Sequence, residues 1–220
     1  MVVVEAQMSV RVVIPTVESR LSQANELAIR TGGEIVIDPV GDGSERSASD
    51  NHVRAMLSAP EDYDWIVILE DDAVVSDSFL DDLESALSSV VPKAVVSLYL
   101  GRGRPASIQP PIQRTVDSLD DTVSWLKMPN LYWGVGVAIN YREVHSVADY
   151  VLSSSLPWDT AVGRWCLTSR TPVLYTWPSL VDHRDTETTI NHADGRGRAP
   201  GRVAWSFGSP TKNGTTVVVK

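Results

Sequence analysis

Three adjacent carboxylates, Glu70, Asp71 and Asp72, directly follow an apolar run at residues 65–69. A continuous apolar run is typical of a central strand in a parallel sheet, because helices cover both faces of such a strand. Ligands of open sheets bind beyond the carboxyl ends of the strands, so we expect these acids at a ligand site. Clustered carboxylates repel one another unless they share a hard cation, such as Mn²⁺ or Mg²⁺, with a bound phosphate. The sequence therefore predicts a divalent metal site at residues 70–72.

The strand periodicity divides the three acids between two sides of the chain. Successive strand side chains point to opposite faces, which places Glu70 and Asp72 together and Asp71 on the other side. One acid can then bind the metal while another binds a second group. The competing interpretation is a solvated acidic turn followed by a helix cap at residues 76–78. The position of the acids directly after a buried strand favours the metal site.

The elements that must position these acids alternate along the first hundred residues. Apolar runs predict strands at 10–14, 34–38, 64–69 and 94–100, and apolar stripes at helical spacing predict helices near 18–31, 47–59 and 79–91. This alternation predicts an α/β fold with a mostly parallel central sheet and helices on both faces. In the second half, we expect strands at 133–139 and 172–177 and helices at 142–152 and 160–167.

The bulk properties limit the class of protein. A chain of 220 residues with 43% hydrophobic residues is long enough for one domain with a substantial core. The net charge of -9 disfavours general nucleic-acid binding, and the single Cys166 excludes a disulfide framework. No apolar run reaches the ~20 residues that span a bilayer, and the start has no basic signal-peptide region, so a cytoplasmic protein is expected. We expect a single domain over 1–220, with 1–7 as an extension and 184–220 as a flexible lid or tail.

Five segments in a fixed order resemble a known family. They are residues 12–16 (VVIPT), 68–73 (ILEDDA), 133–136 (WGVG), 157–159 (PWD) and 178–183 (PSLVDH). Together they are similar to GT-A fold glycosyltransferases, and within these to compact bacterial and phage enzymes related to glycosyltransferase family 25. The resemblance implies a single Rossmann-like domain that takes a sugar from a nucleoside-diphosphate sugar, expected to be a UDP-sugar, with Mn²⁺ or Mg²⁺ as cofactor.

The resemblance also implies roles for individual residues. Asp72 is expected to bind the metal, with His183 and Asp71 as further ligands. His192 replaces His183 if the alignment is shifted, and a loop histidine bonded to a backbone carbonyl is the structural alternative. The nucleotide is expected to contact Thr16, Arg20, Asp38, Glu70 and Asp71, although a helix cap and a turn also explain Thr16 and Asp38.

The chemistry implied is sugar transfer through a transition state with oxocarbenium character. The metal neutralises the departing diphosphate, and Arg184, Arg196 and Arg198 are expected to close over it. Asp159 is the expected general base of an inverting reaction, and an ordinary helix cap is its structural alternative. Seven Trp against two Phe is an unusual bias, and indole rings stack on sugars. The residues expected beside the sugar or acceptor are Trp133, Gly134, Gly136 and Trp158.

Two other functions remain open. A nucleotidyltransferase shares the sheet and the metal acids, although residues 16–19 lack the glycine-rich basic loop that it would need. A sugar- or nucleotide-binding module without catalysis is the non-enzyme alternative. A phosphatase with an Asp-x-Asp motif is disfavoured because Glu70 stands at the first position. The acceptor, whether a glycan, a protein or a modified nucleic acid, is left open, as is inversion or retention.

Overall fold

The computed structural model describes residues 8–185 and 201–220. The strands of this part are β1 (Val10–Thr16), β2 (Glu34–Ile37), β3 (Trp65–Leu69), β4 (Ala73–Val75), β5 (Val95–Ser97), β6 (Val123–Met128), β7 (Gly136–Asn140), β8 (Val173–Thr176), β9 (Val181–His183) and β10 (Thr215–Val218). The α-helices are α1 (Leu21–Thr31), α2 (Glu45–Leu57), α3 (Phe79–Ser88), α4 (Gln109–Val116), α5 (Tyr141–Ser153) and α6 (Trp158–Ser169).

Eight strands form one central sheet in the order β10-β6-β8-β5-β7-β3-β1-β2, and β4 pairs with β9 in a separate two-stranded sheet. Within the described sheet, four neighbouring pairs are parallel, namely β1/β2, β1/β3, β5/β8 and β6/β10. The three antiparallel pairs are β3/β7, β5/β7 and β6/β8. The predicted α/β class with a mostly parallel sheet is confirmed.

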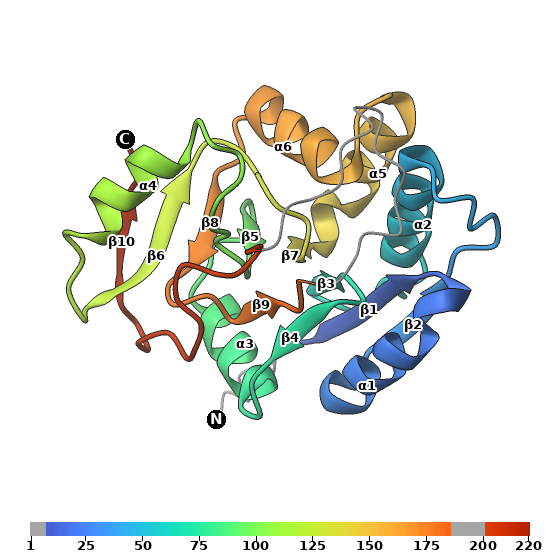
Figure 1. Ribbon diagram of the computed structural model, residues 1–220, viewed down its shortest axis with the longest axis horizontal. Helices are drawn as coiled ribbons and strands as arrows, with labels where there is room; N and C mark the ends of the chain where they lie inside the picture. The colour runs from blue at the N-terminus through green and yellow to red at the C-terminus, as the bar shows by residue number, and fades with distance from the viewer. Residues whose placement is uncertain (1–7, 186–200) are drawn as a thin grey trace, which may run out of the picture.

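Helices cover both faces of the sheet (Figure 1). Helices α2, α5 and α6 lie on one face, where Met56, Val147 and Val162 join one hydrophobic cluster. Helices α1 and α3 lie on the other face, where Leu27 and Leu83 join a second cluster. Both faces of β3 are therefore covered, which explains why this strand is a continuous apolar run.

Local sequence signals explain the ends of the first helices. Helix α1 ends at Gly32, which takes a φ of 65° and donates its N–H to the carbonyl of Ala28. Helix α2 begins after Ser44, whose hydroxyl accepts a hydrogen bond of 3.0 Å from the backbone N–H of Ser47. The predicted start at Ser47 is therefore late, because Ser44 and not Ser47 is the cap.

Strand β7 runs antiparallel to both of its neighbours, β3 and β5. Gly136, at the start of β7, therefore pairs with Leu69, at the end of β3. The backbone N–H of Glu70 continues this pairing by donating to the carbonyl of Val135 at 3.0 Å. The residues that precede β7 are thus held beside the acids that follow β3.

The carboxyl-terminal part of the chain returns to the sheet. Strand β10 pairs with β6 at one edge, and single bridges join Gly101 to Ala204 and Ser179 to Phe207. Residues 1–7 of the expected extension and 186–200 of the expected lid lie outside the described residues, so a lid over 184–220 stays a prediction. Among the described helices, none has the length and apolar character needed to cross a bilayer.

Candidate metal centre

The carboxyl ends of β1 and β3 bring the acids and their partners together. Thr16 ends β1, and the chain turns directly after β3, where the N–H of Ala73 donates to the carbonyl of Glu70 at 2.9 Å. This turn leads into β4, which pairs with β9 so that Ala73 faces His183. The pairing places a histidine from late in the sequence next to acids from the first third.

Asp71 is buried and is bonded through both carboxylate oxygens. Its Oδ2 accepts from the hydroxyl of Thr16 at 2.7 Å, and its Oδ1 accepts from Nη1 of Arg20 at 2.8 Å. Burial raises the pKa of Asp71, and these two hydrogen bonds act against the rise. Thr16, Arg20 and Asp71 thus form one hydrogen-bonded group between β1, the start of α1 and the turn after β3.

The two carboxylate oxygens of Asp72 differ in their hydrogen bonding. Its Oδ2 accepts from Nη1 of Arg20 at 2.8 Å and lies 3.4 Å from Nε2 of His183. Its Oδ1 is buried and has no hydrogen-bond partner among the described residues. A buried carboxylate oxygen without a partner is unfavourable, so a bound cation is the group that this position fits.

Glu70, Asp72 and His183 each offer one ligand atom, and these three atoms lie within 4.8 Å of one another. Burial raises the pKa of Glu70 well above its ordinary value, and the nearby carboxylates of Asp72 and Asp159 raise it further. Two carboxylates and one imidazole form a donor set that Mn²⁺ accepts. The cluster can therefore bind a divalent metal, which would also remove the repulsion between the acids.

The hydrogen bonds of His183 determine where its proton lies. Its Nδ1 accepts from the backbone N–H of Asp185 at 2.8 Å, so the neutral ring carries its proton on Nε2, which faces Asp72. Burial lowers the pKa of His183, although Asp72 acts in the opposite direction. To bind a metal through Nε2, the ring must move its proton to Nδ1 and lose the hydrogen bond from Asp185.

Asp159 lies in the first turn of α6. Its Oδ1 accepts from the backbone N–H of Thr160 at 2.6 Å and from the Thr160 hydroxyl at 3.1 Å. Burial raises the pKa of Asp159, and the nearby carboxylate of Glu45 raises it further. Because Asp159 in turn raises the pKa of Glu70, the two carboxylates lie within electrostatic reach of each other.

Gly134 lies between Glu70 and Trp158. A Cβ atom at this glycine would lie 2.8 Å from Oε1 of Glu70 and 3.0 Å from Nε1 of Trp158. Gly136 is different, because a Cβ there would meet Val181, Leu69 and Leu98, which are packing contacts.

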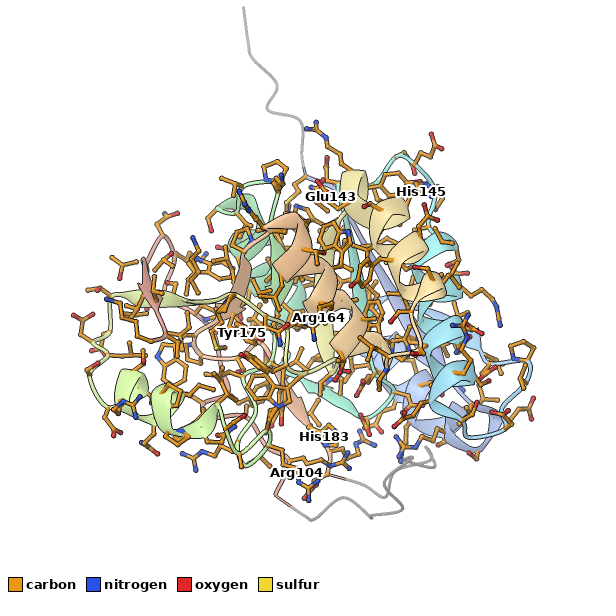
Figure 2. All side chains as sticks on the ribbon, turned by 90° about the horizontal axis from the view of Figure 1, so that it is seen from above. Arg104, Glu143, His145, Arg164, Tyr175 and His183 are labelled. Carbon is orange, nitrogen blue, oxygen red and sulfur yellow. The ribbon has the colours of Figure 1, made fainter. Side chains whose placement is uncertain are left out.

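Trp133 contacts Arg104 and Tyr99. Its Nε1 donates to the carbonyl of Arg104 at 2.7 Å, and its ring meets Tyr99 edge to face at 6.1 Å. Figure 2 shows Arg104 and His183 at one edge of the molecule, opposite the part of α5 that carries Glu143 and His145.

Asp38, expected near the nucleotide, follows β2 and is buried. Its Oδ1 accepts from the N–H of Val40 at 3.0 Å, and its Oδ2 accepts from the hydroxyl of Ser47 at 2.5 Å. The amide of Asn51 donates to the carbonyls of Thr16 and Val36 near the same strand ends. Both oxygens of Asp38 thus stabilise the connection between β2 and α2.

The expected arginines lie in different places. The guanidinium of Arg184 is 3.0 Å from a carboxylate oxygen of Glu26 in α1. Arg196, Arg198 and the alternative ligand His192 lie outside the described residues. Arg202, which was not predicted, lies 3.3 Å from Asp185 and lowers the pKa of both Glu70 and His183.

Tyr99 is the second residue near the site that was not predicted. Its ring lies 6.4 Å from that of His183, and burial raises the pKa of its hydroxyl. Its position just after β5 was the available signal, because residues beyond the carboxyl end of a central strand are expected at the ligand site. For Arg202, the only signal was the basic character of the chain after Glu187.

No protein-family model matches the sequence, and a search of curated proteins found no match. Among solved structures, the chain is similar to mannose-1-phosphate geranyltransferase from Thermus thermophilus, at 10% identity over 77% of this chain and 74% of that chain, with a TM-score of 0.38. The inositol-1-phosphate CTP transferase from T. maritima matches at 9% identity over 78% and 86%, with a TM-score of 0.40. A glycosyltransferase involved in glycosylation of the major capsid of PBCV-1 matches at 12% identity over 75% and 81%, with a TM-score of 0.35. At these TM-scores the likenesses do not indicate the function of this chain.

Proposed function

We propose that this protein is a metal-dependent glycosyltransferase that moves a sugar from a nucleoside-diphosphate sugar, with UDP as the expected nucleotide, to an acceptor hydroxyl. The observation that carries the proposal is the carboxylate of Asp72, which is grouped with Glu70 and His183 and whose buried Oδ1 has no hydrogen-bond partner among the described residues. This group follows β3, at the edge of the sheet where ligands of α/β proteins bind. The kinship with glycosyltransferase family 25 is part of the same proposal.

The residues present fit a divalent ion. Asp72 would bind it through Oδ1, Glu70 would supply a second carboxylate oxygen, and His183 would supply nitrogen once its proton has moved to Nδ1. When bound, Mn²⁺ or Mg²⁺ supplies the positive charge that stabilises the departing diphosphate. Asp71, which the resemblance also makes a ligand, would act from the other side of the turn by holding Thr16 and Arg20.

The acceptor hydroxyl must lose its proton, and we assign this role to Asp159. A carboxylate with a raised pKa is a better base near neutral pH than an ordinary aspartate. Its electrostatic coupling to Glu70 supports a position beside the metal and the sugar. A base separate from the metal ligands is the arrangement that an inverting displacement needs.

The nucleotide would lie over the ends of β1 and β2. Thr16, Arg20 and Asp38 line this region, and each already makes an internal hydrogen bond that orders the site. Arg184, Arg196 and Arg198, in the expected lid, remain our proposal for the diphosphate. Arg202 joins them, because its charge acts on Glu70 and His183.

The experiment is thermal unfolding of the whole chain with UDP, GDP and TDP, each with and without Mn²⁺. A ligand at 100 times its dissociation constant adds about 2.7 kcal/mol to the stability, which is readily measured. We expect stabilisation by UDP only when Mn²⁺ is present, and its loss in Asp72→Asn. The control is Asp81→Asn, which changes an exposed acid of α3 and leaves the response intact.

Transfer is then tested with a panel of UDP-sugars and hydroxyl acceptors. Release of UDP together with a glycosylated product supports the proposal. Release of pyrophosphate from a nucleoside triphosphate would instead support the nucleotidyltransferase. Nucleotide binding without turnover of any donor would support the non-catalytic module, and binding of no nucleoside diphosphate would rule out the glycosyltransferase.

A further inference from the structure

The indole N–H of Trp158 is a buried donor without a hydrogen-bond partner in the described part of the chain. The side chain is only 4% exposed, so water cannot freely satisfy the N–H. Nearly all buried polar groups of folded proteins have a partner, and the exceptions are frequently functional. A ligand atom is therefore the partner to look for.

The carboxylate of Glu70 lies beside the same position. A point where Gly134 would carry its Cβ is 2.8 Å from Oε1 of Glu70 and 3.0 Å from Nε1 of Trp158. The two polar atoms are thus no farther apart than the sum of these distances. One hydroxyl oxygen can lie within hydrogen-bond reach of two atoms that are this close, donating to the carboxylate and accepting from the indole.

Gly134 is needed here for space and not for backbone conformation. Its φ is not positive, so an L-amino acid could adopt the same backbone. Any side chain would instead collide with Glu70 and Trp158. A glycine kept for space marks a place where another group approaches the backbone closely.

The position of Trp158 is fixed by His52. The two rings are stacked, with centroids 5.1 Å apart and planes 24° apart. Nδ1 of His52 lies 2.8 Å from the carbonyl of Ala48, one turn earlier in α2, which fixes the imidazole. The indole is therefore held before any ligand arrives, which lowers the entropy lost on binding.

From these contacts we propose that Glu70, Gly134 and Trp158 form a subsite that recognises one hydroxyl group of the donor sugar. This inference rests on the proposed function. Glu70 belongs to both the metal cluster and the subsite, so the hydroxyl lies beside the ion that binds the diphosphate. The sugar attached to that diphosphate is the one that reaches this point, and Asp159, the residue after Trp158, lies beside it.

The test measures affinity for UDP and for the UDP-sugar selected by the panel, both with Mn²⁺, in wild type and in Trp158→Phe. The variant keeps an aromatic ring against His52 but lacks the N–H. We expect UDP-sugar to bind about tenfold more weakly, which corresponds to about 1.4 kcal/mol, and UDP alone to bind unchanged. The matched control is Trp165→Phe in the same helix, because Nε1 of Trp165 donates to Ser146 at 3.1 Å.

Two further measurements keep the inference testable if Trp158→Phe is poorly folded. Gly134→Ala places a methyl group against both polar atoms and should weaken UDP-sugar by a larger factor than UDP, which is affected only through the contact of Glu70 with the ion. Wild type should also bind the monodeoxy donor that lacks the recognised hydroxyl about tenfold more weakly, with no further loss in Trp158→Phe.

The outcomes separate this inference from the proposed function. Equal weakening of UDP and UDP-sugar in Trp158→Phe would overturn the subsite. So would a change confined to the KM of the acceptor, since the hydroxyl would then belong to the acceptor. If wild type binds no nucleoside diphosphate, the proposed function itself fails. If Trp158→Phe binds UDP-sugar as tightly as wild type does, only the subsite is ruled out.

Discussion

Nη1 of Arg20 donates to Oδ2 of Asp72 at 2.8 Å, and Oδ1 of the same carboxylate is left buried without a partner in the described structure. The same nitrogen donates to Asp71 at 2.8 Å. One guanidinium thus offsets the negative charge of two buried carboxylates, through one oxygen of each. Asp72 is thereby held in place, with Oδ2 bonded to Arg20 and 3.4 Å from Nε2 of His183, and with Oδ1 left for another partner.

Replacing Arg20 by Ala should destabilise the protein strongly in the absence of metal. The side chains of Arg20, Asp71 and Asp72 are each no more than 10% exposed, and removing one partner of a buried ion pair costs about 3–5 kcal/mol. Mn²⁺ should restore part of this loss, because the cation replaces the missing charge. Urea unfolding with and without Mn²⁺ measures both effects.

The control for Arg20→Ala is Arg30→Ala. Arg30 pairs with Asp77, whose side chain is fully exposed, so this change should cost less than about 1 kcal/mol of stability. Mn²⁺ should leave this cost the same, because Arg30 is not part of the metal cluster. If Mn²⁺ stabilises Arg20→Ala no more than wild type, the ion does not bind next to Asp72.

Replacing His183 by Gln separates two roles of the imidazole. Nε2 of His183 lies 3.4 Å from Oδ2 of Asp72, and a glutamine amide can still face that oxygen, but glutamine is a poorer metal ligand than histidine. If His183 binds the ion, Mn²⁺ affinity should fall at least tenfold, measured by isothermal titration calorimetry. Unchanged affinity would show that His183 lies beside Asp72 without binding the ion.

Asp159→Asn should lower kcat by 10²–10⁴ while the affinity for the UDP-sugar stays within about twofold of wild type. The reason is that Asn keeps the size of the side chain but cannot accept a proton. Asp149→Asn, an exposed change on α5, is the control. A loss in kcat below tenfold would place the base elsewhere, and the anomeric configuration of the product, read by NMR, would then distinguish inversion from retention.

His52→Phe should change how stability depends on pH. Burial lowers the pKa of His52 to about 4 from 6.5, so the unfolded chain takes up a proton before the folded chain does. The stabilisation that neutral His52 allows is complete above pH 6.5 and is lost as the pH falls to about 4. The shift corresponds to about 3 kcal/mol.

Other buried groups act in the opposite direction, since raised pKa values of Glu70 and Asp159 favour the folded state as pH falls. The useful quantity is therefore the difference in unfolding free energy between wild type and His52→Phe, which keeps an aromatic ring against Trp158. In chelator, this difference should shift in favour of the variant between pH 7 and 4.5. Parallel curves would mean that His52 is not protected from protonation.

The first half of the fold could be predicted because its signals are local. Strands β1, β2, β3 and β5 lie in short apolar runs, and each helix carries a stripe and a clear end such as Gly32 or Pro60, whereas the three-residue β4 was not predicted. Helix α4 was missed because Pro110 and Pro111 look like a break, although proline is accepted in the first turn of a helix. Strand β9 spans three residues, which is too short for a periodic pattern.

Other elements depend on contacts between distant parts of the chain. Strand β10 was not predicted, and its pairing with β6 joins segments that lie far apart in the sequence. The direction of β7 could not be predicted either, because no periodicity distinguishes a parallel from an antiparallel strand. Arg202 approaches the site through the bridge between Gly101 and Ala204, which no local pattern indicates.

The three acids could be singled out from the sequence because folding alone rarely requires a cluster of charges directly after a buried strand. Their partners followed only in part. Thr16 and Arg20, which the resemblance assigned to the nucleotide, lie in one hydrogen-bonded group with Asp71, whereas the carboxylate of Asp38 is bonded within its own connection. Which oxygen atom is left without a partner cannot be read from residue types.

The small sheet of β4 and β9 holds the two halves of the metal cluster together with three residue pairs, Ala73 with His183, Val74 with Asp182 and Val75 with Val181. Asp72 precedes one strand and His183 ends the other, so separating this ribbon would divide the ligands while the eight-stranded sheet stayed folded. A cation bound by both Asp72 and His183 would keep the two strands paired. Local opening of the ribbon should become rarer when Mn²⁺ is added, so its amide hydrogens should slow in exchange with deuterium by a larger factor than those of β1 and β3.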